Sequence, residues 1–281
     1  MCIFYGKFEK LSCGKVKSMV DFENKPSYDV YDLKKLMSLL RGPEGCPWDS
    51  EQTHESIRRN LLEEAYEAAE AIDDGDMDHL LEELGDVLMQ VIFHADIAEE
   101  SGCFNLNEIA DATCRKLIRR HPHVFGDVKA RDGVESLVFW EDIKRVEKMH
   151  DSAGDSMRSV ARSLPALWRA EKIQKKAAKA GFDWPEHSGA LDALRSELHE
   201  LEQAVASGGD IEEELGDILF SVVNVSRFFD IDPERALGSS SDKFITRFTR
   251  LETAALDKGL RLEDMTLDEM EDLYQQAKLE K

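Results

Sequence analysis

An internal repeat constrains the fold of this chain more than any other feature of its sequence. The string LLEELGDVL at residues 80–88 returns as IEEELGDIL at residues 211–219, about 130 positions later. Four acidic residues of the first copy have counterparts in the second: Glu64, Glu67, Glu83 and Asp86 correspond to Glu197, Glu200, Glu214 and Asp217. A repeat of this length is far longer than one unit of a solenoid protein. The sequence therefore predicts two tandem copies of one domain.

Residue usage and turn chemistry predict that each copy is a helical bundle. Leu, Ala, Glu and Lys are common whereas Val, Ile and Thr are sparse, which favours helix over strand. The turns DDGD (residues 73–76) and SGGD (residues 207–210) each separate two helical patterns, as a hairpin of two helices requires. We therefore expect an all-α fold. Helices are expected near residues 32–40, 55–72, 78–100, 106–119, 134–148, 165–180, 188–206, 211–229 and 233–257, with a loose acidic tail helix over 266–278.

The repeat and the loop composition also predict domain boundaries. We expect an N-terminal extension over residues 1–27, a first domain over 28–150 and a second over 157–281, with a linker at 151–156. The first residues show no clear helical period, and Met19 is a candidate for the true start. Mass spectrometry of the native protein that found residues 1–18 would remove this hypothesis.

Composition excludes several classes of function. A formal net charge of −22 argues against nucleic-acid binding, because phosphate contacts need a basic face. No apolar run reaches the length of a membrane span, and the N-terminus lacks the apolar core of a signal peptide. The five cysteines form no Cys-x-x-Cys pair and are odd in number, which favours reduced thiols in a cytoplasmic protein.

The acidic residues of each hairpin are spaced to converge. Residues three apart share one face of a helix, so Glu64 and Glu67 project together. Glu83 and Asp86 do the same on the next helix, and a short turn brings the two faces within reach of each other. Four carboxylates at one place repel one another, so a cation is the expected partner. Ligation by oxygen alone selects Mg²⁺, or Mn²⁺ as its substitute, over zinc.

A solvated acidic face is the competing interpretation, since glutamate-rich helix faces are usually exposed. On a helical wheel, however, Asp86 lies between Met89 and Phe93 on one side and Val87 on the other. A carboxylate among apolar side chains is costly unless it is paired or bound to a metal. Asp217 has similar neighbours in the second copy, and this repetition favours the metal site.

A di-iron carboxylate bundle is a second metal interpretation. It needs Glu-x-x-His on two core helices, a spacing that Glu51–His54 and Glu147–His150 match. Both pairs lie in polar stretches outside the acidic hairpin, and the second copy has neither. The Mg²⁺ interpretation is therefore preferred.

Several motifs in order along the chain resemble the MazG family. They are GPEGCPWD…QTH (42–54), LLEEAYE (61–67), EELGD (82–86), RRHPHVFGD (119–127), GFDWP (181–185) and KF…RF (243–248). The resemblance covers about residues 28–280. It implies two tandem MazG-like domains of the all-α NTP pyrophosphatase fold, a homodimer, and Mg²⁺-dependent hydrolysis of NTPs and dNTPs to NMP and pyrophosphate. It also implies a role in clearing nucleotides, including damaged ones, from the bacterial cytosol.

The resemblance assigns roles to the repeated residues. Four metal ligands are implied for each domain: Glu64, Glu67, Glu83 and Asp86 in the first, and Glu197, Glu200, Glu214 and Asp217 in the second. The first Glu of the family's EExxE motif is Glu63 in the first copy but Ser196 in the second. Glu63 is a candidate base for the attacking water, as are Glu67 and Glu200 if they are not ligands. The eight implied ligands and Glu63 form the predicted catalytic set.

Basic and aromatic residues are candidates for binding the substrate. Phosphate clamps are expected downstream of each hairpin, at Lys116, Arg119 and Arg120 and at Lys243, Arg247 and Arg250. Solvated or salt-bridged basic faces are the alternative. Trp48 and Trp184 could stack on a base, although each adjoins a proline in a loop and could equally anchor that loop.

Two functions of different classes remain open at this point. One is an NTP pyrophosphohydrolase. The other is a non-catalytic helical scaffold that dimerises and binds partners, with one or both sites inactive. The sequence leaves undecided the base preference, the number of metals per site, the phosphorus atom that water attacks, and which domain is active.

Overall fold

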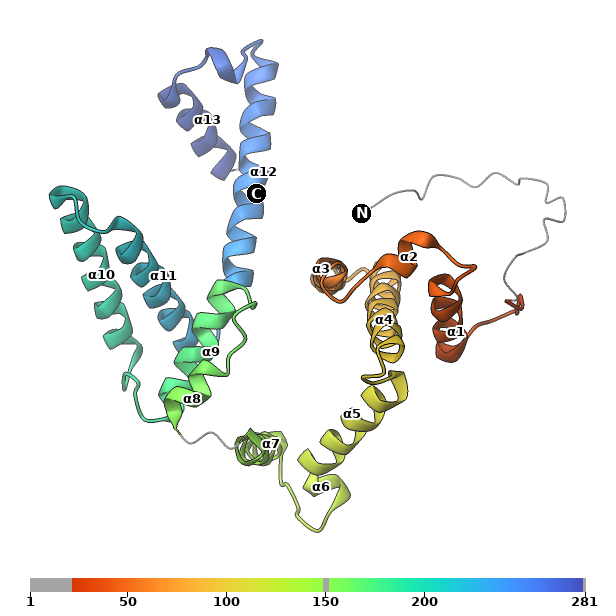
Figure 1. Ribbon diagram of the computed structural model, residues 1–281. Coiled ribbons are helices and arrows are strands. Elements are labelled where there is room, and N and C mark those ends of the chain that lie inside the picture. The colour runs from red at the N-terminus through yellow and green to blue at the C-terminus, as the bar shows by residue number, and fades with distance from the viewer. Residues whose placement is uncertain (1–21, 149–151, 280–281) are drawn as a thin grey trace. The chain divides into compact units, whose positions relative to one another are not determined.

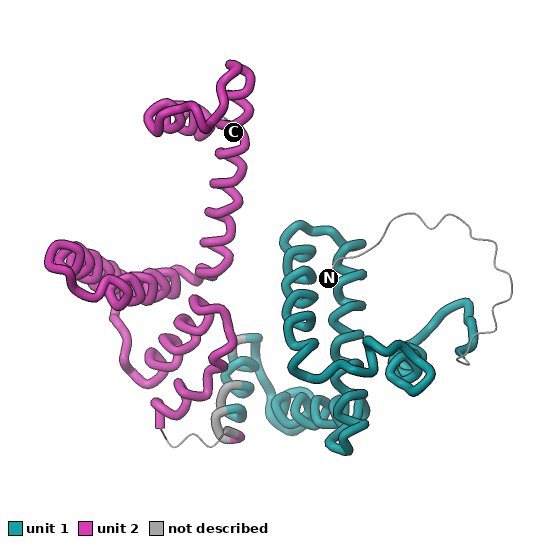
Figure 2. Tube along the Cα trace, turned by 45° about the horizontal axis from the view of Figure 1, so that its top comes forward, with its two compact units in different colours: residues 1–144 teal, residues 145–281 magenta. Residues whose placement is uncertain are grey.

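The computed structural model describes residues 22–148 and 152–279. Within these ranges every regular element is a helix and there is no strand, which confirms the predicted all-α class. None of these helices is both long and apolar enough to cross a membrane. The hypothesis about residues 1–18 and the pair Glu147–His150 involve residues outside the described ranges. The chain divides into two compact units, residues 1–144 and 145–281, shown in two colours in Figure 2.

The first unit is built on a long helical hairpin. Its elements are α1 (Val30–Arg41), α2 (Pro47–Glu51), α3 (Arg58–Asp74), α4 (Met77–Glu100), α5 (Leu106–Arg120), α6 (Pro122–Phe125) and most of α7 (Gly133–Lys148). Helices α3 and α4 pack along each other, and α1 packs against α4 (Figures 1 and 2).

The turn between α3 and α4 contains only two residues, and both have the chemistry that such a turn needs. Gly75 adopts the left-handed conformation with φ of 70°, and its N–H reaches the carbonyls of Ala71 and Ile72. Asp76 then caps α4, because its side chain accepts hydrogen bonds from the backbone N–H groups of Asp78 and His79. The hairpin therefore closes tightly and sets the two acidic helix faces side by side.

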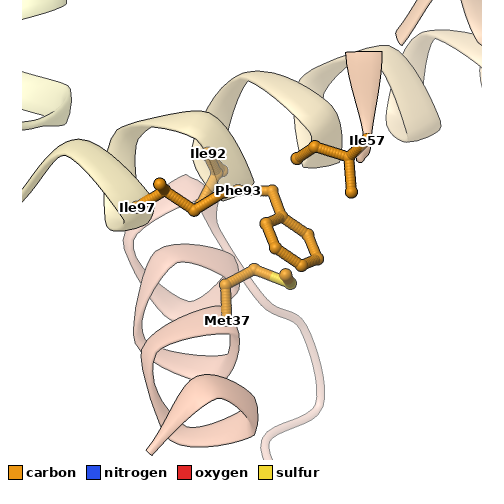
Figure 3. Close-up of a cluster of buried hydrophobic side chains, with 5 residues drawn as sticks. All are labelled: Met37, Ile57, Ile92, Phe93 and Ile97. Atoms are coloured by element: carbon orange, nitrogen blue, oxygen red, sulfur yellow. The ribbon is translucent and has the colours of Figure 1, made fainter. Parts of the chain in front are cut away.

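A small apolar core fixes the hairpin against α1. It contains Met37 of α1, Ile57 just before α3, and Ile92, Phe93 and Ile97 of α4 (Figure 3). Ile92 is completely buried. Burying side chains of this size contributes about 1.5–3 kcal/mol each. The three elements are thereby held together at the end of α4 that lies away from the turn.

A buried arginine ties three elements of the same unit together. The side chain of Arg41, 3% exposed, makes two hydrogen bonds to Glu100 of α4, from Nε at 2.8 Å and from Nη2 at 2.7 Å. Its Nη1 donates to the carbonyl of Asp49 in α2 at 2.5 Å, and the guanidinium lies over the ring of Phe93. This fork joins the end of α1 to α2 and to the end of α4.

The second unit repeats the hairpin. Its elements are α8 (Ala153–Arg158), α9 (Ala166–Lys179), α10 (His187–Ser207), α11 (Ile211–Phe228), α12 (Pro233–Asp257), the 3₁₀ turn η1 (Leu262–Asp264) and α13 (Leu267–Leu279). Gly208 closes the hairpin between α10 and α11 in the left-handed conformation, with φ of 75°, and Asp210 caps α11. Helix α9 packs on α11, where Gln174 donates a hydrogen bond to the carbonyl of Phe220 at 2.8 Å.

Two segments of the second unit differ from the sequence-based expectation. Most of the expected linker at 151–156 belongs to α8, which begins there because Ser152 Oγ accepts a hydrogen bond from the N–H of Asp155. The tail helix α13 is not loose. Leu273 is 4% exposed and packs with Leu251 and Ala255 of α12.

Candidate functional site

The first acidic cluster forms where α3 and α4 face each other. Glu64 of α3 and Glu83 and Asp86 of α4 each offer a carboxylate oxygen, and these oxygens lie within 4.8 Å of one another. Glu67 lies close enough for its charge to act on both Glu64 and Glu83. The structure thus brings together the four residues predicted as ligands in the first copy.

Burial and mutual repulsion perturb this cluster. Burial raises the pKa of Glu64 to about 7, and the charges of Asp86, Glu67 and Glu83 act in the same direction. Burial also raises the pKa of Glu83, with a contribution from Glu67, and the pKa of Asp86, with a contribution from Glu82. Three raised pKa values in one cluster mean that its ionised form needs positive charge nearby.

The residues present fit a hard divalent cation. Glu83 is 7% exposed, and its Oε2 is buried with no hydrogen-bond partner among the described residues. Such an atom is expensive to leave unpaired, and a bound cation would satisfy it. All donors are carboxylate oxygens, the ligands that Mg²⁺ and Mn²⁺ prefer.

The second cluster is related but more exposed. Glu197 and Glu200 of α10 and Glu214 of α11 bring carboxylate oxygens within 4.8 Å of one another. Burial is the main cause of the raised pKa values of Glu197 and Glu214, and the charge of Glu200 is the second cause. The charge of Asp217 also raises both pKa values. Asp217 is therefore electrostatically part of the cluster, although it is not one of the three converging groups.

The apolar surroundings predicted for Asp217 are not buried within the chain. Asp217 is exposed, and so are its neighbours Leu219 (53%) and Phe220 (44%). The prediction that Asp217 is buried among apolar side chains is therefore wrong for the single chain. A helical wheel shows that a face is apolar, but it does not show what covers that face.

The first position of the EExxE motif differs between the copies in structure as well as in sequence. Glu63 pairs with Arg59, with Nε and Oε1 2.6 Å apart. Ser196 instead donates a hydrogen bond from its hydroxyl to Glu200 Oε1 at 3.2 Å. The second copy thus replaces an outer carboxylate with a hydroxyl group that holds one of the converging carboxylates.

The predicted phosphate clamps do not lie at the clusters of the described chain. Lys116, Arg119 and Arg120 lie toward the end of α5, which leaves α4 at the end away from the hairpin turn (Figure 1). The guanidinium of Arg120 lies over the ring of Trp140. Lys243, Arg247 and Arg250 lie on α12, which packs on α9 and α13 and diverges from the hairpin of α10 and α11 (Figure 1).

The two candidate stacking residues are half-exposed. The ring of Trp184, 47% exposed, packs on α10 at Gly189, where a Cβ atom would lie 2.7 Å from the ring. Trp184 therefore anchors its loop while one part of the ring remains accessible. Trp48 is 51% exposed and lies in α2, the short helix that Arg41 holds.

Three histidines on or beside α4 were not assigned to the first cluster by sequence reasoning, and one of them contacts it. His54, the histidine of the Glu51–His54 pair, stacks on His94 of α4, with their Nδ1 atoms 2.8 Å apart. His79 lies beside Glu83, with Nε2 3.1 Å from Oε1. The only signal for His79 in the sequence is its position four residues before Glu83, and this spacing is common in helices.

The fold and the two clusters define the class: a tandem all-α protein with two candidate sites for a divalent cation bound by oxygen. The MazG nucleotide pyrophosphohydrolase domain matches residues 52–125 and again residues 186–250. The chain belongs to the MazG family, as the sequence motifs predicted.

Individual relatives are similar over most of the chain. The nucleoside triphosphate pyrophosphohydrolase/pyrophosphatase MazG of Thermotoga maritima is 44% identical over 247 residues, 88% of this chain and 94% of that protein. A nucleoside triphosphate pyrophosphohydrolase of Escherichia coli K12 is 43% identical over 251 residues, 88% of this chain and 95% of that protein. The uncharacterized protein YabN of Bacillus subtilis is 46% identical over 254 residues, 89% of this chain but 52% of that longer protein.

Proposed function

We propose that this protein hydrolyses nucleoside triphosphates, including deoxynucleoside triphosphates, to the monophosphate and pyrophosphate with Mg²⁺, for which Mn²⁺ can substitute. The observation that carries this proposal is the convergence of Glu64, Glu83 and Asp86 around a buried, unpaired carboxylate oxygen. The names of the relatives from Thermotoga maritima and Escherichia coli support it. Clearing of unwanted nucleotides is the corresponding cellular role.

The residues of the first hairpin would divide the chemistry among them. Glu64, Glu67, Glu83 and Asp86 would hold the cation, which when bound neutralises phosphate charge and lowers the pKa of a coordinated water. Glu63, which pairs with Arg59 and is partly exposed, would be the candidate base that accepts a proton from the attacking water. In the second hairpin, Glu197, Glu200, Glu214 and Asp217 would hold the cation, but no carboxylate occupies the position of Glu63.

A non-catalytic scaffold is the other function considered. The relatives named as pyrophosphohydrolases do not favour it for the chain as a whole. The difference between Glu63 and Ser196 keeps the competence of the second cluster a separate question.

We further propose that the protein acts as a cytoplasmic homodimer. Both hairpins expose large apolar side chains, among them Leu81 (75%), Leu84 (52%) and Leu219 (53%). A second copy would cover these surfaces by the hydrophobic effect and could bring the basic residues of α5 and α12 to the clusters. Free thiols at Cys46, Cys103 and Cys114 are compatible with a reducing compartment.

One assay tests the proposed reaction. The protein is incubated with each NTP and Mg²⁺, and the products are separated by chromatography. NMP with pyrophosphate is the expected result, whereas NDP with phosphate, or no turnover, would contradict the proposal.

Paired substitutions then locate the working cluster. Glu83→Gln with Asp86→Asn disables the first, and Glu214→Gln with Asp217→Asn disables the second. Glu70→Gln, at an exposed position of α3 outside the cluster, is the matched control. Activity that survived both double substitutions together would show that the site assignment is wrong.

A further inference from the structure

An imidazole contacts the first cluster from the N-terminal turn of α4. His79 Nε2 lies 3.1 Å from Glu83 Oε1. The two residues are four apart, so the helix itself places one side chain over the other. The His79 side chain is 40% exposed and that of Glu83 is 9% exposed. A solvent-accessible side chain therefore reaches inward to the buried carboxylate of the cluster.

This contact distinguishes the two oxygens of Glu83. His79 engages Oε1, whereas Oε2 is buried and has no hydrogen-bond partner among the described residues. The terminal torsion of a glutamate is otherwise broad, so a partner at one oxygen restricts where the other can lie. Metal-binding carboxylates commonly have such a supporting partner, and its loss lowers metal affinity by about 10–100-fold.

The second cluster has the opposite chemistry at the same position. The residue four before Glu214 is Asp210, which caps α11 and accepts hydrogen bonds from the N–H groups of Glu212 and Glu213. In the first copy Asp76 is the cap, so α4 has already begun when the chain reaches His79. At this position the first copy therefore has a basic side chain inside the helix, whereas the second has the carboxylate that caps the helix.

We infer that His79 is a positioning residue of the first site, which holds Glu83 in the orientation that binds the divalent cation, and that the second site works without one. This inference rests on the proposed function, because it requires the first cluster to bind the metal. It predicts that the first site binds the cation more tightly than the second.

A purely electrostatic role for His79 has the opposite consequence. A basic group beside a ligand opposes the incoming cation, so its removal would strengthen metal binding. A positioning role means that its removal weakens binding. The direction of the change in affinity therefore decides between the two roles.

The test measures Mn²⁺ binding to the full-length protein without nucleotide, by electron paramagnetic resonance of the free ion. All variants carry Glu214→Gln and Asp217→Asn, so that the first cluster dominates the titration. We expect His79→Ala to raise the Mn²⁺ dissociation constant about tenfold, and His79→Gln, which keeps a side-chain N–H, to restore much of the affinity. Arg115→Ala, which removes an exposed ion pair with Asp111 elsewhere in the first unit, is the control and should change nothing.

Two further results separate the failure of this inference from that of the proposed function. Unchanged or tighter Mn²⁺ binding by His79→Ala overturns the positioning role, provided that Glu83→Gln weakens binding. If Glu83→Gln also binds Mn²⁺ as before, the metal site itself is refuted. Far-UV circular dichroism of each variant without metal checks that its helices are intact.

Discussion

Glu64→Gln should remove a pH dependence of stability that the metal-free protein carries in its first hairpin. Burial and three neighbouring carboxylates raise the pKa of Glu64 from 4.5 to about 7. Between these values the folded hairpin keeps a proton that the unfolded chain has lost. Stability is therefore full below about pH 4.5 and falls as the pH rises through about 7.

The size of this effect follows from the same shift. At 1.36 kcal/mol per pH unit, a pKa raised from 4.5 to about 7 corresponds to about 3.4 kcal/mol. Glu64 is only partly buried, and solvent screening reduces the expected loss to about 1–2 kcal/mol. Glutamine has no proton to lose, so Glu64→Gln should flatten the slope and stabilise the metal-free hairpin at about pH 8.

Hydrogen exchange of the amides of α3 and α4, in protein treated with a chelator, measures this local stability at about pH 5 and about pH 8. Added Mg²⁺ should restore stability to the parent protein at the higher pH but much less to Glu64→Gln. Glu70→Gln should behave like the parent protein. An equal slope in the parent and in Glu64→Gln would refute the assignment of the raised pKa to this residue.

Three further substitutions test packing. Ile92→Ala should lower the free energy of unfolding of the first unit by about 2–4 kcal/mol in a denaturant titration, because the side chain is completely buried; a loss below about 1 kcal/mol would contradict that burial. Gly189→Ala forces a methyl group against the ring of Trp184 and should destabilise the second unit by about 1–3 kcal/mol, with a change in tryptophan fluorescence. Arg41→Met keeps the apolar stem but removes the donors to Glu100 and one of the two donors to the carbonyl of Asp49, and should lower the melting temperature by an amount equivalent to about 2–3 kcal/mol. A double-mutant cycle with Glu100→Gln isolates the part due to that pair, and additive effects would show that the pair is not coupled.

The hairpins could be predicted from sequence because their determinants are local. Glycine and aspartate at the turns and carboxylates three residues apart specify where each helix ends and which face is acidic. The helix predicted at 233–257 agrees with α12 (Pro233–Asp257) because Asp232 and Pro233 form a strong start signal. The short turn and the residue spacing also explain why Glu64, Glu83 and Asp86 lie together.

Features that depend on tertiary contacts could not be predicted in this way. The clamp residues Lys116 and Lys243 were placed by order along the chain, but order does not fix the direction in which α5 and α12 leave their hairpins. The exposure of Asp217 could not be predicted either. The hydrophobic periodicity of a helix shows which face is apolar, but it does not identify the element or chain that covers that face. The contact between His79 and Glu83 depends on where α4 begins, and the spacing of the two residues alone does not fix that start.

The short turns also determine when each site can assemble as the chain folds. Only Gly75 and Asp76 separate α3 from α4, so the ligand candidates of the first cluster meet through contacts between residues that are close along the chain. Contacts of this kind form early and quickly, and the N-terminal part of a protein folds first during synthesis. The first carboxylate cluster can therefore close while the second copy is still being translated.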